Sequence, residues 1–294
     1  MRTFGHVLTA MITPFHEDGA VDYKAAAKIA KHLISHGSDG LVVAGSTGEA
    51  ATMTLDEKLR LFEAVLEAVG DQATIIGGTG SNDTKASIAA TQAAEKVGIH
   101  GAMAVVPYYN KPPQEGMYQH FKAIAENTSL PLVLYNVPGR TGSNLMPATV
   151  ARLAKLSNVA ALKEASGNLE QIAEVVRQTP EDFLVYSGDD SLTLPVLSVG
   201  GCGIISVAAH LVGERMQEMI AAFYAGNKEE AMRIHGELLP IFRLMFITTN
   251  PIPVKTAVNL LGLPGGQFRL PMVEPSEAEL LHIRQGLTAV GLLG

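Results

Sequence analysis

Eight short apolar segments recur along the 294-residue chain, roughly every 20 to 30 residues. Each is a nearly continuous run of apolar residues, which is typical of parallel strands that are covered on both faces. The segments are HVLTAMI (6–12), GLVVAG (40–45), ATIIGG (73–78), GAMAVV (101–106), LPLVLYN (130–136), NVAALKE (158–164), DFLVYSG (182–188) and CGIISV (202–207). We interpret them as eight strands.

Helical patterns fill the intervals between these strands. Apolar residues keep helical spacing over 22–36, 54–69, 82–98, 146–156 and 168–178. The segment 54–69 opens on Thr54 with Glu57 three residues later, which is the spacing of a capping box. The segment 82–98 opens on an Asn-Asp pair and stops at Gly98.

Strands that alternate with helices eight times predict a (β/α)8 TIM barrel, for which about 250 residues plus extensions is a usual length. A doubly wound open sheet is the alternative, but it usually has fewer strands. After about residue 212 the pattern is purely helical. We therefore predict a barrel catalytic domain over 1–225 and a C-terminal helical segment over 226–294.

The charge and cysteine content restrict the cellular setting. A formal net charge of −7 argues against nucleic acid or an anionic membrane as the main partner. Cys202 is the only cysteine, which excludes a disulfide framework and favours a reducing, cytoplasmic location. No run approaches the roughly 18 apolar residues of a membrane span.

Charged residues make up only 17% of the chain, which suggests that other subunits cover part of the surface.

The active site of such a barrel lies at the carboxyl ends of its strands. The residues expected there are GSTGEA (45–50), GTGSN (78–82), PYYNKP (107–112), YNVPGRTG (135–142), Lys163-Glu164, SGDD (187–190) and GIISVAAH (203–210). Hydroxyl groups, one lysine, one arginine and several glycines should thus converge on one rim.

Lys163 is the most informative of these residues, because lysine is rarely buried without a partner or a purpose. Burial disfavours the ammonium form, so the pKa should fall and leave an amine that can condense with a carbonyl to form a Schiff base. The competing interpretation is a lysine paired with a carboxylate across the barrel mouth. The other lysines, such as Lys58, fall on helix faces or loops where we expect solvation, and Lys255 is an exception without a strand setting.

Four further features could serve this chemistry. Tyr135 ends the strand before that of Lys163, where its phenol could transfer protons. The backbone N–H groups of the turn at Ser46 and Thr47 could hold a carboxylate, as helix N-termini hold anions. Arg140 could form a bidentate pair with a second carboxylate. The adjacent Tyr108 and Tyr109 form an aromatic loop that suits a site or an interface.

Two other kinds of site are disfavoured. The nine histidines are scattered, with no H-E-x-x-H motif and no cluster at the strand ends, so a metal-dependent aldolase is not expected. The segment GGTGSN (77–82) follows a strand but does not match G-x-G-x-x-G, which argues against a dinucleotide cofactor.

Taken together, the strand-end residues resemble the pyruvate-dependent class I aldolase family of dihydrodipicolinate synthase and N-acetylneuraminate lyase. The resemblance covers essentially the whole chain. GSTGE, YNVP and the lysine of the sixth strand are similar to the superfamily in general. The motifs that resemble the dihydrodipicolinate synthase branch are PYYNKP, YNVPGRTG, KEASGNL, SGDD and NPIPVK.

The resemblance implies a reaction and a role for each residue. The reaction is the condensation of pyruvate with L-aspartate 4-semialdehyde, without a cofactor, in diaminopimelate and lysine biosynthesis. Lys163 would form the Schiff base. A proton relay would consist of Tyr135, Ser46 and Tyr109. The protein would be a homotetramer built as a dimer of dimers, in which Tyr109 reaches the active site of a neighbouring subunit. Thr47 would bind the pyruvate carboxylate, Gly188 and Ile205 would line the pyruvate pocket through their backbones, and Arg140 would bind the semialdehyde carboxylate.

The sequence departs from the family pattern at two places. Ser46 stands where the synthases commonly carry threonine, which keeps the hydroxyl and loses a methyl group. The positions of Leu55, Lys58 and Ala86 resemble two histidines and a glutamate in lysine-inhibited members, while Asn82 and Tyr108 match. We therefore predict weak or absent inhibition by lysine.

Two other functions compete with this one. A different aldolase on the same barrel would cleave N-acetylneuraminate or 2-keto-3-deoxygluconate, but Arg140 and the double tyrosine argue against it. A non-catalytic sensor of keto acids would not need the intact set of lysine, tyrosine and hydroxyl groups.

Overall fold

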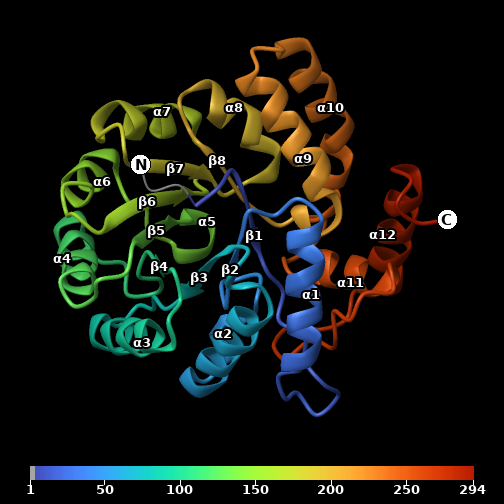
Figure 1. Ribbon diagram of the computed structural model, residues 1–294, viewed down its shortest axis with the longest axis horizontal. Helices are drawn as coiled ribbons and strands as arrows, with labels where there is room; N and C mark the ends of the chain where they lie inside the picture. The colour runs from blue at the N-terminus through green and yellow to red at the C-terminus, as the bar shows by residue number, and fades with distance from the viewer. Residues whose placement is uncertain (1–3) are drawn as a thin grey trace.

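The computed structural model describes residues 4–294 and contains a closed barrel of eight parallel strands (Figure 1). The strands are β1 (Val7–Ala10), β2 (Gly40–Val43), β3 (Thr74–Gly78), β4 (Gly101–Val105), β5 (Leu132–Asn136), β6 (Val159–Glu164), β7 (Leu184–Ser187) and β8 (Gly203–Ser206). Each lies within a predicted segment. Because β1 pairs with β8, with Leu8 opposite Ile205, the sheet is closed. The barrel is confirmed and the open sheet is excluded.

Helices surround the barrel, and short helical turns lie at its carboxyl-terminal rim. The surrounding helices are α1 (Tyr23–Ser35), α2 (Leu55–Val69), α3 (Thr84–Val97), α4 (Gln114–Ala125), α6 (Pro147–Leu153), α7 (Leu169–Gln178), α8 (Thr193–Ser198) and α9 (Ala209–Tyr224). The rim turns are η1 (Ala50–Thr52), α5 (Pro138–Thr141) and η2 (Asp190–Leu192). Thr54 and Glu57 form the predicted capping box at the start of α2.

Two of these helices, α4 and α8, lie in segments where the patterns above named no helix. Two prolines precede α4, no side chain caps its first turn, and Gly116 weakens its helical propensity. The helix forms because Met117, Phe121 and Ile124 are buried on one face. Tertiary packing therefore outweighs local propensity here.

Strand alternation decides which residues of β6 point into the barrel. Ala161 belongs to the apolar cluster inside the barrel, together with Tyr135, whereas Leu162 belongs to the cluster between the barrel and the helices. Successive side chains of a strand point to opposite faces, so Lys163 shares the interior face of Ala161. Glu164 faces outward, where Asn136 and Gln171 donate hydrogen bonds to its carboxylate.

The C-terminal segment consists of α10 (Lys228–Leu244), α11 (Ile252–Leu260) and α12 (Glu277–Ala289). It lies beside α9 at one side of the barrel (Figure 1). The predicted boundary at residues 225 and 226 falls in the turn between α9 and α10, and the division into two domains stays a prediction. Within residues 4–294, no helix combines the length and the apolar character needed to cross a membrane.

Candidate active site

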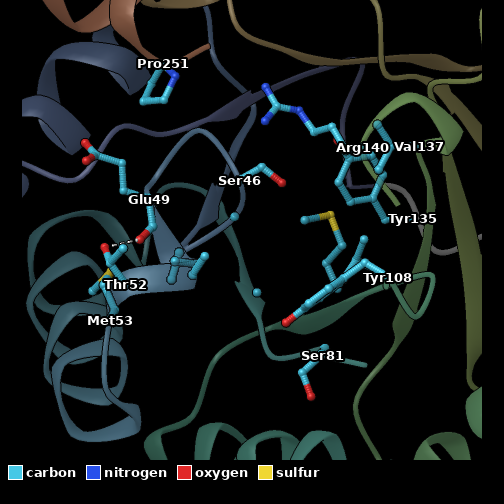
Figure 2. A pocket seen from close by; sticks show the side chains of 18 of the residues that line it. Ser46, Glu49, Thr52, Met53, Ser81, Tyr108, Tyr135, Val137, Arg140 and Pro251 are labelled. Atoms are coloured by element: carbon cyan, nitrogen blue, oxygen red, sulfur yellow. Dashed lines mark hydrogen bonds between the residues drawn. The ribbon is translucent and has the colours of Figure 1, made fainter. Parts of the chain in front are cut away.

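A cavity of about 380 Å³ opens at the carboxyl ends of the strands. Three of the predicted site residues, Ser46, Tyr135 and Arg140, line it, and Figure 2 shows Ser46 between the rim turn η1 and the Tyr135 ring. Ser46 follows β2, Tyr135 lies in β5, and Arg140 lies in α5. Residues that are up to 94 positions apart in sequence therefore meet at one end of the barrel, as the barrel fold requires.

Lys163 is not among the residues that line this cavity, but it is adjacent to Tyr135, which does line it. The two residues are directly paired between β5 and β6, and the Lys163 Nζ atom lies 4.6 Å from the centroid of the Tyr135 ring. The lysine is only 5% exposed. Among residues 4–294, its Nζ atom forms neither a hydrogen bond nor an ion pair. The competing interpretation of a lysine locked against a carboxylate is therefore wrong for Lys163.

Burial lowers the pKa of Lys163 to about 8, and the Arg140 charge acts in the same direction while Asp190 opposes it. This pKa corresponds to a preference of roughly 3 kcal/mol for the neutral amine, relative to an exposed lysine. About one molecule in ten would carry the free amine at pH 7, compared with fewer than one in a thousand for an ordinary lysine. The site thus supplies a nucleophile near neutral pH.

The phenol of Tyr135 remains protonated in this setting. Burial raises the pKa of Tyr135, whereas the Arg140 charge and the Ser46 hydroxyl act in the opposite direction. A neutral phenol beside an amine can donate a proton to an oxygen that leaves during condensation. Tyr135 can therefore act as an acid toward a molecule that is attached to Lys163.

Asn250 connects two of the predicted binding residues. Its Nδ2 atom donates to Thr47 Oγ1 at 2.9 Å, and its backbone oxygen accepts a hydrogen bond from Arg140 at 3.1 Å. Because Thr47 Oγ1 accepts this bond, its own proton is available to another acceptor. Thr47 itself is buried beside the cavity and is not among the residues that line it.

Gly188 follows β7 beside Lys163, and Ile205 lies on the interior face of β8. A Cβ atom on Gly188 would lie 2.7 Å from Ala165 Cβ and 3.2 Å from Lys163 Cε, so a side chain there would crowd the lysine. Ile205 belongs to the same interior apolar cluster as Tyr135. Neither residue lines the cavity.

The two tyrosines of the aromatic loop after β4 lie in different environments. Tyr108 lines the cavity, whereas the side chain of Tyr109 is 90% exposed and lies outside it. Tyr109 has a φ of 70°, a left-handed conformation that is uncommon for residues other than glycine. Its participation in a neighbouring active site stays a prediction.

Three features of the site were missed or misread in the sequence. Lys58 was expected to be solvated, but it lines the cavity, and burial lowers its pKa. The link through Asn250 joins residues 203 positions apart, which no local pattern reveals. Lys255 was noted without a role, and it forms a buried ion pair with Glu49.

Metal-ligating side chains are not grouped in the described part of the chain. Between residues 4 and 294, no three His, Cys, Asp or Glu residues lie close enough to hold a metal ion. The groups that line the cavity include the phenol of Tyr135, the hydroxyl of Ser46 and the guanidinium of Arg140.

Comparison with known proteins identifies the family. The model of the Dihydrodipicolinate synthetase family matches residues 3–290. The chain belongs to this family. It is 58% identical over 289 residues to 4-hydroxy-tetrahydrodipicolinate synthase of Heliobacterium modesticaldum, covering 98% of this chain and 96% of the relative. The corresponding protein of Desulforamulus reducens is 57% identical over 291 residues, covering 99% and 98% of the two chains.

The solved structures include close relatives as well. Dihydrodipicolinate synthase from Cyanidioschyzon merolae, crystallised with lysine bound, is 49% identical and superposes with a TM-score of 0.97 over 99% of each chain. A relative of this similarity shares the whole barrel and the C-terminal helices. The resemblance of the strand-end motifs to the dihydrodipicolinate synthase family is thus confirmed.

The lowered pKa of Lys163 makes a testable difference in its reactivity. Below pH 8 the ammonium predominates and is unreactive, and above pH 8 the free amine predominates. Competitive labelling with a small electrophile such as acetic anhydride, read by mass spectrometry, should show a midpoint near pH 8 for Lys163. Labelling of the exposed Lys24 serves as the control for the reagent, and a Lys163 midpoint near the ordinary lysine value of about 10.4 would contradict the assignment.

Proposed function

We propose that this protein is a 4-hydroxy-tetrahydrodipicolinate synthase, a lyase that condenses pyruvate with L-aspartate 4-semialdehyde in diaminopimelate and lysine biosynthesis. The observation that carries the proposal is the buried Lys163 amine, which has no carboxylate partner and lies against Tyr135 at the cavity. The relatives that are 57–58% identical over nearly the whole chain carry the name of this enzyme.

Schiff-base formation is the first step. The neutral Lys163 amine attacks the C2 carbonyl of pyruvate and gives a carbinolamine. Tyr135 donates a proton to the C2 hydroxyl, which leaves as water, and the nitrogen forms a double bond to C2. The protonated imine then withdraws electrons from C3, so the Tyr135 phenolate takes up a proton from C3 and an enamine forms. The imine itself is the electron sink, so no additional cofactor is required.

Carbon–carbon bond formation follows. The enamine C3 attacks the aldehyde carbon of the semialdehyde, and the aldehyde oxygen takes up a proton from the relay of Tyr135, Ser46 and the partner's tyrosine. The amino group of the semialdehyde then attacks C2 and displaces Lys163. This transimination closes the ring and regenerates the free lysine, so one water molecule is lost overall.

The two substrate carboxylates are assigned to different residues. We assign the pyruvate carboxylate to Thr47 and the backbone N–H groups of its turn, because Asn250 leaves the Thr47 proton available. Gly188 and Ile205 bound the pyruvate pocket through their backbones, and a side chain at Gly188 would crowd Lys163. Arg140 takes the semialdehyde carboxylate, because its guanidinium lines the cavity at the rim.

Aldehyde selectivity tests this function. The enzyme should turn over pyruvate with L-aspartate 4-semialdehyde, and it should not cleave N-acetylneuraminate or 2-keto-3-deoxygluconate. Arg140→Ala should raise the KM for the semialdehyde by about 10- to 100-fold, because charge-assisted hydrogen bonds are lost, with little change in the KM for pyruvate. Arg152→Ala removes an exposed arginine that pairs with Glu115, and it should leave both values unchanged. Turnover with a sugar acid alone would contradict the proposal.

The oligomeric state is a further part of the proposal. We infer a homotetramer, a dimer of dimers in which Tyr109 completes the relay of a neighbouring subunit, because this tyrosine is 90% exposed on a constrained loop. The loop is held by Asn110, whose Nδ2 atom donates to the Asn82 oxygen at 2.9 Å, and by Asn82, which donates to the Tyr108 oxygen at 3.2 Å.

Subunit mixing tests the role of Tyr109. Tyr109→Phe and Lys163→Ala should each be nearly inactive alone. When the two variants are unfolded and refolded together, mixed oligomers should recover activity, because a Lys163→Ala subunit supplies an intact tyrosine to its neighbour. Sedimentation should give four times the chain mass. Absence of recovery in confirmed mixed tetramers would show that Tyr109 acts within its own subunit, and full activity of Tyr109→Phe alone would show that it has no part in the relay.

Lysine should be a poor inhibitor. Lys58 lines the cavity as a partly buried cation, and Leu55 and Ala86 offer no carboxylate to an incoming ammonium group. We expect no half-inhibition at sub-millimolar lysine, because like charges repel in a desolvated site. The triple variant Leu55→His, Lys58→His, Ala86→Glu should gain inhibition. Half-inhibition of the unmodified enzyme below about 1 mM would contradict this expectation.

The remaining parts of the proposal concern organisation and location. We assign residues 1–225 to the catalytic barrel and 226–294 to a helical segment that completes the site through Asn250 and Lys255. Truncation after residue 225 should therefore abolish activity. The single cysteine, Cys202, supports a cytoplasmic location, which fractionation of the activity in cells would test.

A further inference from the structure

A second buried lysine lies close to the active site, and the mechanism above does not use it. Lys255 in α11 is fully buried. Its Nζ atom donates to Glu49 Oε1 at 2.7 Å and to the backbone oxygen of Thr13 at 2.8 Å. Lys163 and Lys255 therefore differ in one respect that matters, because only Lys255 has a carboxylate partner.

The partner of Lys255 belongs to the turn that carries Ser46 and Thr47. The Glu49 backbone N–H donates to the Ser46 oxygen at 3.1 Å, which closes the turn. Glu49 has a φ of 55°, a left-handed conformation that a residue with a Cβ atom adopts only when its surroundings hold it there. The preceding Gly48 packs directly on the segment that follows β1, since a Cβ atom there would lie 3.0 Å from the Met11 oxygen.

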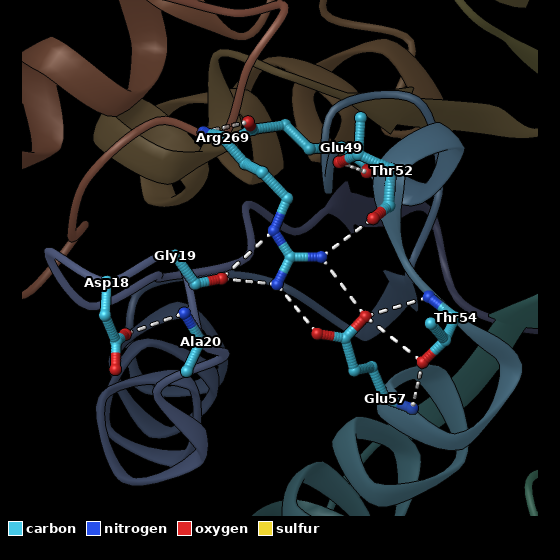
Figure 3. Close-up of polar contacts among 8 residues, drawn as sticks. All are labelled: Asp18, Gly19, Ala20, Glu49, Thr52, Thr54, Glu57 and Arg269. Atoms are coloured by element: carbon cyan, nitrogen blue, oxygen red, sulfur yellow. Dashed lines mark hydrogen bonds and ion pairs between the residues drawn. The ribbon is translucent and has the colours of Figure 1, made fainter.

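Arg269, in the loop after α11, holds the same turn from another side. Its backbone N–H donates to Glu49 Oε2 at 3.1 Å, so both carboxylate oxygens are engaged by the C-terminal segment. Its guanidinium donates to the Thr52 oxygen at 2.8 Å and to Glu57 Oε1 at 2.7 Å (Figure 3). The hydrogen bonds from Arg269 lower the pKa of Glu57 to about 2, so this carboxylate is ionised at neutral pH.

These contacts have a consequence for the active site. Ser46 and Thr47 lie between the end of β2 and Glu49, and the backbone of Glu49 is bonded to that of Ser46. A displacement of the Glu49 side chain therefore moves the two residues to which we assign proton relay and carboxylate binding. Replacement of a buried ion pair by apolar residues is often neutral for stability, so stability alone gives no reason for a pair here.

We propose that the Lys255–Glu49 ion pair is a positioning device, through which the C-terminal segment fixes the Ser46–Thr47 turn in the geometry that binds pyruvate. This inference rests on the proposed function, since it assumes that the turn receives the pyruvate carboxylate. Lys255 and Glu49 are positioning residues, because neither is assigned a contact with substrate. Their effect falls on pyruvate binding and not on the nucleophile, which stands on a different strand.

Three variants and a control separate positioning from general stability. Glu49→Gln keeps the side-chain length and removes the charge, Lys255→Met leaves Glu49 unpaired, and the double variant removes both charges. Leu287→Ala is the control, because it opens a cavity in α12 at a fully buried position remote from the turn. Each full-length variant is incubated with increasing pyruvate and reduced with cyanoborohydride. Its Lys163 adduct is quantified by mass spectrometry, and its Tm is measured.

The proposal expects a shift in the pyruvate concentration that gives half-maximal labelling. It should rise about 10-fold or more in Glu49→Gln, Lys255→Met and the double variant, because small displacements of binding groups are costly. The double variant should regain Tm relative to Lys255→Met without regaining pyruvate affinity. Leu287→Ala should lose Tm and keep the half-maximal concentration of the unmodified enzyme.

One result would overturn the positioning role, and a different result would overturn the proposed function. An unchanged half-maximal pyruvate concentration in Glu49→Gln and in the double variant would overturn the positioning role, and these two variants decide the matter even if Lys255→Met does not fold. The absence of any Lys163 adduct in the unmodified enzyme would instead overturn the proposed Schiff-base mechanism.

Discussion

The chemistry proposed for this protein depends on an amine that is buried without a counterion. Lys163 loses its hydration inside the barrel, and no carboxylate among the described residues compensates by pairing with it. The cost of burying an ammonium there appears as a lowered pKa, which is the property that a Schiff-base lysine needs. Burial lowers the pKa of Lys255 as well, but the Glu49 carboxylate at 2.7 Å opposes that shift and gives the Lys255 side chain a fixed place.

The barrel and the C-terminal segment contribute differently to the site. The strands fix Lys163 and Tyr135 by register, which leaves these two residues little freedom relative to each other. The turn after β2 is not part of the hydrogen-bonded sheet. It is held instead by Asn250, Lys255 and Arg269 of the C-terminal segment. The C-terminal helices thus contact the turn that the proposed site uses, and the family model covers them within residues 3–290.

Much of this arrangement could be predicted from the sequence. The regular recurrence of short apolar runs predicted all eight strands. The position of Lys163 at the end of one strand predicted a buried amine. The family motifs then supplied roles for the surrounding residues. Helix α4 was missed because tertiary packing, and not propensity, determines it. The links from Asn250 to Thr47 and from Lys255 to Glu49 were missed because each joins residues more than 200 positions apart.

Reductive trapping of pyruvate tests the central claim most directly. The unmodified enzyme is incubated with pyruvate and borohydride at neutral pH, and its peptides are mapped by mass spectrometry. An uncharged amine at Lys163 predicts an adduct of about 72 Da on this residue and none on the ion-paired Lys255, because only the free amine is nucleophilic. An adduct on another lysine, or an unmodified chain, would contradict the account.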